Sequence, residues 1–338
     1  MEESSFALSN MTFVRPAHFY INGFYDFPHG TYFYIFLCFV YIMTVFGNVV
    51  LLLIILLVRS LHTPKYMIVF NLALTDLCGS TALIPKLLDT FLFENRYISY
   101  EACLSYMFFV LFFGSVQSWT LVAMSFDRFV AICFPLHYHS VVSKPVIAAL
   151  LTFVWLLALG VIAPLAGLID RLSFCKTVVI QSFYCDNAPV YRISCNTYFI
   201  NNQVGIFSAV IMLLVPLALV GCSYACITYA LKRIVSGGER LKALKTCTSH
   251  LILVAIFFIP VISTNIAVHF PNFHPNTRMI NSALTHTVPA LLNPFIYSLK
   301  TEEMLTAIKK ILSKVSKVKN IVILSNSPLR KNDIYIYI

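Results

Sequence analysis

The sequence predicts an all-α membrane protein, a bundle of seven transmembrane helices followed by a short amphipathic helix. Hydrophobic residues make up 59% of the 338 residues and charged residues only 11%, whereas soluble domains usually carry about 25% charged residues. Apolar residues gather in windows long enough to cross a bilayer, which takes about 20 residues. The net charge of +10 is unevenly spread, with eight Lys and Arg between Lys300 and Lys331. These observations exclude a disordered chain and a soluble enzyme, and leave no soluble fold to bind nucleic acid.

Seven windows account for the predicted spans. They are continuous runs rather than alternating apolar and polar residues, which favours helices over barrel strands. The second window is interrupted by Asp76 and Lys86. In chain order the windows are Thr31–Val58, Tyr66–Leu92, Ala102–Phe126, Pro145–Ile169, Asn202–Leu231, Leu251–Val268 and Met279–Leu299.

The distribution of basic residues predicts the orientation. The first ten residues contain Glu2 and Glu3 and no basic residue, unlike a signal peptide, so the first span is expected to act as its own signal. With the N-terminus outside, only seven of the 24 Lys and Arg lie on the outer side, in agreement with the positive-inside rule. Asn10-Met11-Thr12 is a glycosylation acceptor and fits this orientation. We therefore expect a multi-pass plasma-membrane protein with an extracellular N-terminus and a cytoplasmic C-terminus.

Four regions follow from this topology. Residues 1–29 are predicted to form an extracellular tail, residues 30–300 the seven-span domain, residues 301–313 an amphipathic juxtamembrane helix, and residues 314–338 a cytoplasmic tail. In residues 301–313, apolar side chains such as Met304 and Ile308 recur at helical spacing beside Lys309 and Lys310. This pattern is typical of a helix lying on the inner leaflet, with membrane lipid as its partner.

Four of the ten cysteines fall on the outer side, and the other six lie in or near spans. An even number of cysteines in an oxidising compartment predicts two disulfides. Three pairings of these cysteines are possible. A zinc site is not favoured, because the sequence contains no CxxC pair. The four outer cysteines are Cys103, Cys175, Cys185 and Cys195.

Polar residues inside the spans are candidates for function, because ionisable groups are costly at membrane depth. Asp76 is the clearest, with Asn48, Gln117 and Asn293 as its expected neighbours. This cluster could hold Na⁺ or a proton, or could be a hydrogen-bonded network without an ion; both interpretations stay open. No other cofactor is expected.

The inner end of the third span carries Asp127-Arg128. Arg128 could extend to the interface, or the two could form an ion pair that breaks on activation. In the seventh span, Asn293-Pro294 precedes Tyr297, and a proline there kinks the helix beside polar side chains. The sequence thus predicts a movable inner end.

These features resemble rhodopsin-like (class A) G-protein-coupled receptors over about residues 25–315. Cys103 opens the third span, Asp127-Arg128 closes it, Trp155 lies in the fourth, and Asn293-Pro294-Phe295-Ile296-Tyr297 lies in the seventh. The resemblance implies a seven-helix receptor that couples to a heterotrimeric G protein.

Longer strings narrow the resemblance to the odorant receptors. They start at Leu61 (LHTPKY), Met124 (MSFDRFVAIC), Lys242 (KALKTCTSHL) and Pro289 (PALLNP), with Ser223-Tyr224 as a fifth match. The family usually has other residues at Phe126, Phe129, Leu244-Lys245 and Phe258-Ile259. These departures resemble the odorant receptors of bony fish.

The resemblance implies the pairs Cys103–Cys185 and Cys175–Cys195, and an odorant bound among the outer halves of the third, fifth, sixth and seventh spans. The expected ligand residues are Val110, Gly114, Ser115, Ser118, Asp186, Ser208, Met212, Phe258, Val261, Asn265 and His286. It also implies the stimulatory olfactory G protein, which raises cyclic AMP. The expected coupling residues are Asp127, Arg128, Tyr224, Lys245, Asn293, Pro294 and Tyr297.

Three other classes of membrane protein are alternatives to an odorant receptor. The first is a class A receptor for another small ligand, but an amine receptor usually has Asp where Val110 stands, and a retinal protein needs a Lys in the seventh span. A transporter often shows inverted repeats, and none is visible. A membrane enzyme is not expected, because HExxH, GxSxG and a credible triad are missing.

Overall fold

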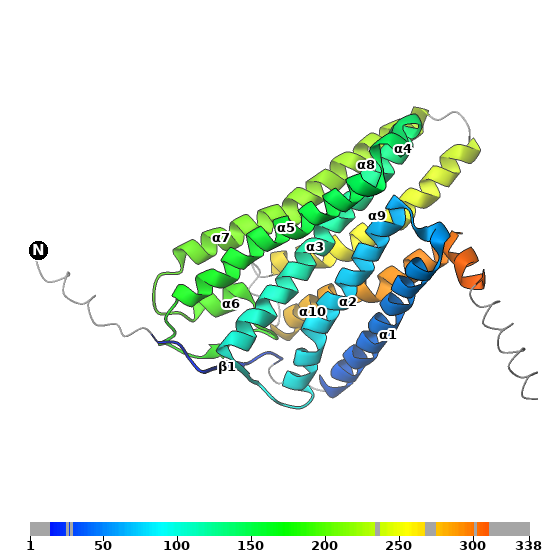
Figure 1. The fold of residues 1–338 in the computed structure, drawn as a ribbon. Helices are drawn as coiled ribbons and strands as arrows, with labels where there is room; N and C mark the ends of the chain where they lie inside the picture. Colours follow the sequence, from blue (N-terminus) through cyan, green and yellow to red (C-terminus); the bar gives the residue numbers. More distant parts are fainter. Residues whose placement is uncertain are drawn as a thin grey trace, which may run out of the picture.

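The computed structural model describes residues 14–24, 27, 30–233, 237–267, 275–300 and 303–310. Figure 1 shows long helices packed side by side, with strand β1 at one end of the bundle. Within the described residues, six helical segments are long and apolar enough to cross a membrane. They are α1 (Gly30–Leu57), α2 (Pro64–Phe91), α3 (Tyr100–Cys133), α5 with η3 (Lys144–Arg171), α7 to α8 (Phe199–Arg233), and Cys247–Thr264 of α9.

The predicted seventh crossing corresponds to α10 (Pro275–Lys300), which packs against α1, α2 and α9. This helix is not among the six apolar spans. Several of its polar side chains point into the bundle: Asn281 Nδ2 donates to Ser263 Oγ at 2.9 Å and to Thr264 Oγ1 at 2.8 Å. Polar groups that point into the bundle lower the mean apolarity of α10, although they do not face lipid. Because α10 is therefore not among the apolar spans, the seventh crossing stays a prediction.

The sixth predicted span is longer than its apolar window. Helix α9 spans Gly237–Ala267 and so begins well before Leu251. The predicted window keeps to the apolar run that begins at Leu251, but a helix continues into the polar interface as long as its backbone is hydrogen-bonded. Short helices lie between the spans: η1 (Arg59–Leu61), η2 (Pro135–His137), α4 (Tyr138–Val141) and α6 (Asn187–Arg192).

Residues 303–310 are helical, within the predicted juxtamembrane helix. Met304 and Ala307 are buried, whereas Lys309 and Lys310 are exposed. The described turns therefore bury an apolar face against the bundle and turn a basic face outward; residues 301–302 and 311–313 lie outside the described part.

The fifth predicted span changes its winding midway. Helix α7 (Phe199–Ala209) leads into a π-helical turn, η4 (Val210–Leu214), and then into α8 (Val215–Arg233). The Val215 N–H bonds to the Val210 carbonyl, and the next bond in that pattern would need an N–H at Pro216, which has none. The indole of Trp119 in α3 donates to the Ile211 carbonyl instead, at 3.2 Å. Pro216 thus leaves the Ile211 carbonyl free, and Trp119 uses this carbonyl to link the fifth span to α3.

A small sheet, which was not predicted, covers the end of the bundle that the sequence predicts to face outward; this end is from here on called the outer end, and the opposite end the inner end. Its order is β2-β1-β3, with β1 (His18–Ile21) antiparallel to β2 (Tyr97–Ser99) and parallel to β3 (Val179–Ile180). Strands of two to four residues carry too little alternation to be recognised in a sequence. Buried Phe19 and Ile21 in β1 anchor the sheet in the outer core.

Candidate functional site

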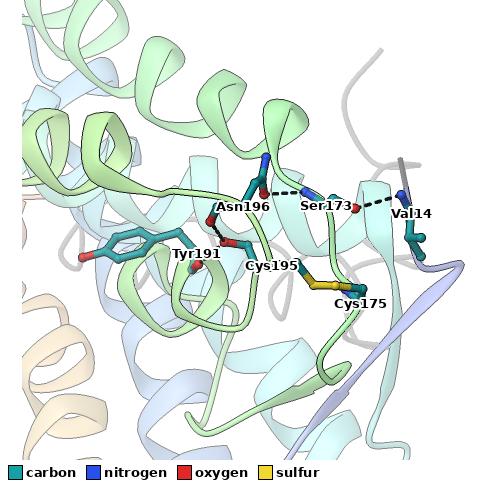
Figure 2. The surroundings of a disulfide bond; sticks show 7 residues. Val14, Ser173, Cys175, Tyr191, Cys195 and Asn196 are labelled. Carbon is teal, nitrogen blue, oxygen red and sulfur yellow. Dashed lines mark hydrogen bonds between the residues drawn. A yellow bond between two sulfur atoms is a disulfide. The ribbon is translucent and has the colours of Figure 1, made fainter. Parts of the chain in front are cut away.

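The outer end is fastened by covalent and polar links. The structure joins Cys103, at the start of α3, to Cys185, and Cys175 to Cys195; these are the pairs implied by the resemblance. In Figure 2, the Val14 N–H donates to Ser173 Oγ at 2.9 Å, beside the second disulfide. The Ser173 N–H donates to Asn196 Oδ1 at 2.9 Å. The N-terminal segment is thereby attached to the loop between α5 and α7.

A second link joins that segment to two helices. The Arg15 guanidinium lies 3.1 Å from Asp170 Oδ1 and 4.9 Å from the centre of the Tyr100 ring. The Tyr100 hydroxyl donates to the same Asp170 oxygen at 2.9 Å. Residues 14–21 therefore form a strap, from here on called the N-terminal strap, that ties α3 to η3 (Leu168–Arg171), the short helix after α5.

The expected ligand face of α3 lies inside the bundle. Val110, Ser115 and Ser118 are buried, and a methyl group at Gly114 would meet no atom within 4 Å. Ser115 Oγ donates to the Leu111 carbonyl at 2.7 Å. Ser118 Oγ, by contrast, is buried with no hydrogen-bond partner among the described residues. This face of α3 therefore combines open space at Gly114 with an unsatisfied buried hydroxyl one turn further along.

Three more expected ligand residues are buried on neighbouring helices. They are Ser208 in α7, Met212 in the π-helical turn and Phe258 in α9. The π-helical turn lies against α3, so Met212 and Ser118 belong to adjoining segments. Val261 is half-buried in α9, and the side chain of Asn265 lies outside the described part.

Two ionisable ligand candidates lie near the outer loop. The ring of His286 in α10 meets that of Tyr184 edge-on at 6.0 Å, and Tyr184 in turn meets Tyr106 of α3 at 6.0 Å. Asp186 caps α6 by accepting from the Asn187 N–H at 2.8 Å. Burial raises the pKa of Asp186, against the hydrogen bonds from Asn187 and Tyr184. Asp186 thus shapes the loop and is linked to the ligand candidates through Tyr184.

The Asp76 cluster forms only in part. Asp76 Oδ1 accepts from Gln117 Nε2 at 2.9 Å and Oδ2 from Asn293 Nδ2 at 2.7 Å, so α2, α3 and α10 are joined. Asn48 Nδ2 instead donates to the carbonyls of Thr44 and Ala290, at 2.9 and 3.0 Å. Close helix packing explains the latter contact, because a methyl group at Gly47 would lie 3.3 Å from Pro294 Cβ. Asn48 therefore joins α1 to α10 rather than binding Asp76.

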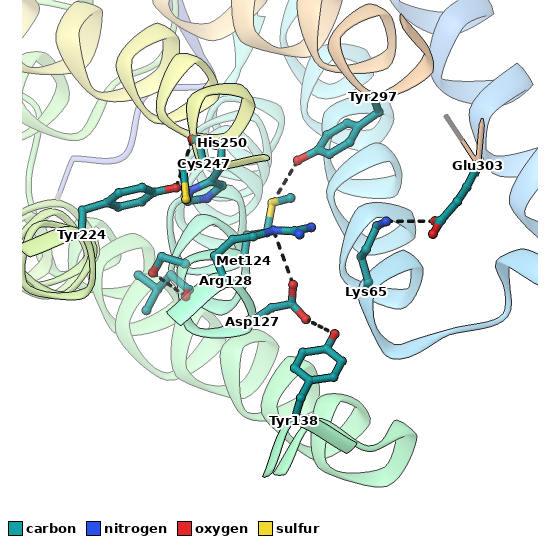
Figure 3. Close-up of polar contacts among 12 residues, drawn as sticks. Lys65, Met124, Asp127, Arg128, Tyr138, Tyr224, Cys247, His250, Tyr297 and Glu303 are labelled. Carbon is teal, nitrogen blue, oxygen red and sulfur yellow. Dashed lines mark hydrogen bonds and ion pairs between the residues drawn. The ribbon is translucent and has the colours of Figure 1, made fainter. Parts of the chain in front are cut away.

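The inner end of α3 carries the ion pair that the sequence suggested. Arg128 Nε lies 3.5 Å from Asp127 Oδ2, and Asp127 Oδ1 accepts from the Tyr138 hydroxyl at 2.7 Å (Figure 3). Burial and the Asp127 carboxylate raise the pKa of Tyr138, so the phenol stays protonated and donates. Sequence reasoning missed Tyr138, because nothing in the string after Asp127 shows that α4 folds back toward α3.

The other coupling candidates surround Arg128 (Figure 3). The Tyr224 hydroxyl and His250 Nδ1 are 2.7 Å apart, and their rings stack at 5.7 Å, so α8 and α9 are linked. The Tyr297 hydroxyl donates to Met124 Sδ at 3.1 Å, which links α10 to α3. The Lys245 side chain lies outside the described part. Non-covalent contacts between side chains thus bring the inner ends of four helices together.

A further contact attaches the juxtamembrane helix. Glu303 Oε2 accepts from Lys65 Nζ at 2.9 Å and from the Tyr66 hydroxyl at 2.7 Å. Burial alone would raise the pKa of Glu303, but these hydrogen bonds and the Lys65 charge outweigh it and lower the pKa. Sequence reasoning missed this role of Glu303, because the contact joins residues 65, 66 and 303.

Comparison with known proteins agrees with this geometry. Residues 37–315 match the family model described as "Olfactory receptor". The rat protein named "Olfactory receptor 1" is 36% identical over 288 residues, 85% of this chain and 91% of the relative. The human protein named "Olfactory receptor 52B2" is 34% identical over 298 residues, 88% of this chain and 92% of the relative. The match extends over almost the whole helical bundle, and the chain therefore belongs to the olfactory receptor family of class A G-protein-coupled receptors.

Proposed function

We propose that this receptor binds its odorant inside the bundle, beside Gly114 and Ser118, and activates the stimulatory olfactory G protein, which raises cyclic AMP. Membership of the family makes it a multi-pass plasma-membrane receptor for an odorant that acts through a G protein, and not an enzyme. The open space at Gly114 next to the unsatisfied Ser118 hydroxyl carries the proposal for the site.

The proposed ligand is small and partly apolar, with one group able to hydrogen-bond. Val110, Met212 and Phe258 supply buried apolar surface, and Ser118 supplies a polar partner. A ligand that bonds to Ser118 removes the desolvation penalty of that hydroxyl, so it gains more than its apolar contact alone. The remaining ligand candidates, Ser115, Asp186, Ser208, Val261, Asn265 and His286, complete the proposed site.

Coupling is proposed to work through the inner contacts. A ligand can shift the receptor toward its active arrangement only by binding that arrangement more tightly. The contacts of Arg128, Tyr224 and Tyr297 are non-covalent and join α3, α8, α9 and α10, so they can exchange partners when α9 moves. Asp127, Lys245, Asn293 and Pro294 are the other proposed members of this coupling set.

The proposed topology has seven crossings, with α10 as the seventh, an extracellular N-terminus and a cytoplasmic C-terminus. The concentration of Lys and Arg in the inner loops and after Lys300 supports it. The proposed regions remain residues 1–29, 30–300, 301–313 and 314–338, and glycosylation at Asn10 falls outside the described part. The Asp76 carboxylate with two amide groups suits either Na⁺ or an ion-free network, and the likeness to bony-fish receptors stays a prediction.

The test is a cyclic AMP assay in cells that express the receptor with the stimulatory olfactory G protein, using a mixed panel of amino acids, acids, alcohols, aldehydes and amines. Antibody staining of the N-terminus on intact cells measures surface expression and orientation. We expect a ligand-dependent rise in cyclic AMP that Gly114→Leu abolishes, because leucine fills the open space.

Gly160→Leu is the matched control, since a methyl group at Gly160 in α5 also meets no atom within 4 Å but points away from the bundle. It should keep the response. Equal responses in both leucine variants would contradict the proposed site, and an N-terminus stained only after permeabilisation would contradict the topology.

A further inference from the structure

A hollow of about 410 Å³ opens on the wall of the bundle between α2 and α5, near the turn that joins α1 to α2. Its walls are mainly apolar and include Leu61, Tyr66, Phe70, Leu151 and Trp155. Leu61 and Tyr66 lie at the same end of α2 as the Lys65–Glu303 contact. In the proposed orientation, which is the one part of the proposed function used here, this is the cytoplasmic half of the membrane.

The deep end of this hollow offers no spare polar group. The Trp155 indole donates to Asn71 Oδ1 at 2.8 Å, and Asn71 Nδ2 donates to Thr120 Oγ1 at 2.8 Å. These two bonds join α2, α3 and α5 and occupy the polar atoms behind the wall. A molecule that enters this far therefore meets apolar surface and suits an apolar chain rather than a polar head.

The mouth of the hollow is positively charged. Lys144, the first residue of α5, lines it and is exposed. None of the four ion pairs found among the described residues includes Lys144. The His62 ring, also at the mouth, bonds through Nε2 to the Leu56 carbonyl at 3.1 Å and adds no negative charge. The lining residues contain no carboxylate, so an anionic group would be attracted there.

We propose that this hollow binds one anionic glycerophospholipid from the inner leaflet. Its phosphate-bearing head pairs with Lys144 Nζ, and one acyl chain runs along Phe70 and Leu151 toward Trp155. Because lipid tails are as apolar as the hollow's walls, the tail gains little by leaving the bilayer. Selectivity therefore resides in the headgroup charge, as in other basic pockets between helices on the cytoplasmic side.

A second hollow, of about 480 Å³, provides a comparison on the outer half. It lies between α2 and α3 and is lined by Lys86, Tyr97, Ile98 and Phe109, among others. Here the cation is already neutralised, because Lys86 Nζ lies 2.5 Å from Asp89 Oδ2. This outer hollow has a similar volume, but its lysine is already paired with Asp89. We therefore expect it to show no preference for anionic lipid.

The experiment measures lipid bound to the purified full-length receptor by native mass spectrometry. The probes are dioleoyl phosphatidylserine and dioleoyl phosphatidylcholine, which share acyl chains and differ in head. We expect phosphatidylserine to bind about fivefold more tightly, the effect of one lysine near an anionic lipid. Lys144→Gln should remove this preference and Lys144→Arg should keep it.

Two variants separate the hollow from general surface charge. Lys232→Gln removes a cation at the inner end of α8, away from the hollow, and should keep the preference. Leu151→Trp narrows the hollow and should reduce binding of both lipids.

Equal binding of the two lipids by the natural receptor would overturn the proposal, as would a preference that survives Lys144→Gln. Displacement of bound phosphatidylserine by cholesterol, with no loss in Lys144→Gln, would instead identify a sterol groove and overturn it as well. The measurement uses neither odorant nor G protein, so its failure is separate from any failure of the proposed function.

Discussion

The two ends of the bundle are held together by different kinds of contact. At the outer end, two disulfides, a three-stranded sheet and the N-terminal strap join segments far apart in sequence. At the inner end, the described contacts between α3, α8, α9 and α10 are side-chain hydrogen bonds and packing, and the one ion pair lies within α3. Covalent and sheet links restrict relative motion, whereas single hydrogen bonds can be exchanged at a net cost of about 1 kcal/mol each.

The difference suits a receptor that detects on one side and signals on the other. In the proposed function, the fixed outer frame keeps the space beside Gly114 in shape, so that the ligand meets an already formed site. In the same proposal, a loosely tied inner end lets the ligand select between two arrangements, because the inner contacts can be exchanged at small cost. The predictions below disturb one end at a time.

The largest effect is expected from Cys103→Ala at the outer end. Loss of a native disulfide costs about 2–5 kcal/mol, and this one also fixes the loop that carries Asp186. The variant should be retained inside the cell, as measured by N-terminal surface staining. Cys38→Ala, which removes a free half-buried thiol in α1, should reach the surface; equal staining of the two variants would contradict a structural role for the outer link.

Arg128→Ala should separate folding from signalling. The side chain is mostly buried at the inner end, away from the disulfides and the sheet, so the variant should stain at the surface like the natural receptor. Its odorant-dependent cyclic AMP response should be lost. Arg59→Ala, at an exposed position in η1, is the control and should signal; a full response from Arg128→Ala would remove this residue from the coupling set.

Tyr224→Phe should loosen the inner end without removing packing. The phenylalanine keeps the ring stacked on His250 but loses the hydroxyl contact at 2.7 Å. A net loss of about 1 kcal/mol shifts the equilibrium about fivefold. Because this contact holds α8 against α9, we expect higher cyclic AMP without odorant. Tyr229→Phe, on the exposed side of α8, should leave the basal level unchanged, and a similar rise there would argue against a specific α8–α9 tie.

Asp186→Asn should alter the pH dependence of stability at the outer end. Burial raises the pKa of Asp186 above that of the unfolded chain, so the folded receptor holds more protons between the two pKa values. Its unfolding free energy therefore falls as the pH rises through that interval. Thermal unfolding of the purified receptor across acidic pH should show this fall, and Asp186→Asn should flatten it. An unchanged slope would assign the dependence to another group.

Arg15→Ala should have the smallest effect. The Arg15 and Asp170 side chains are 46% and 54% exposed, and such ion pairs contribute about 0.2–1 kcal/mol. The midpoint temperature of thermal unfolding should fall by about a degree. This fall should be smaller than in Tyr100→Phe, which removes the shorter hydrogen bond to the same carboxylate. A larger shift in Arg15→Ala would mean that the ion pair, rather than the buried tyrosine, holds the N-terminal strap.

The sequence predicted the parts of the fold that depend on local composition. Five charge-free windows, and one interrupted by Asp76 and Lys86, located the six apolar spans, because membrane helices must satisfy their own backbone and show apolar side chains to lipid. The sheet could not be predicted from local composition, because β1 pairs with strands near residues 97 and 179, far from it in the sequence. The π-helical turn before Pro216 could not be predicted in this way either, because the Trp119 bond beside it joins two helices.

The site was predictable by residue type more than by contact. Asp76, Gln117 and Asn293 do meet, because polar groups in spans turn toward one another. Asn48 bonds elsewhere, since the rotation of α1 about its axis is set by its close packing on Pro294 of α10 at Gly47. Tyr138 and Glu303 gained roles only once the short helices folded back onto the bundle.

Hydrogen exchange of the receptor in phospholipid nanodiscs, with and without the nucleotide-free stimulatory olfactory G protein, tests the contrast between the two ends most directly. We predict that amides of β1 and β2 stay protected in both samples, while exchange changes at the inner ends of α8 and α9 when the G protein binds. Equal changes at both ends, or a change confined to the outer sheet, would contradict a fixed outer frame and a movable inner end.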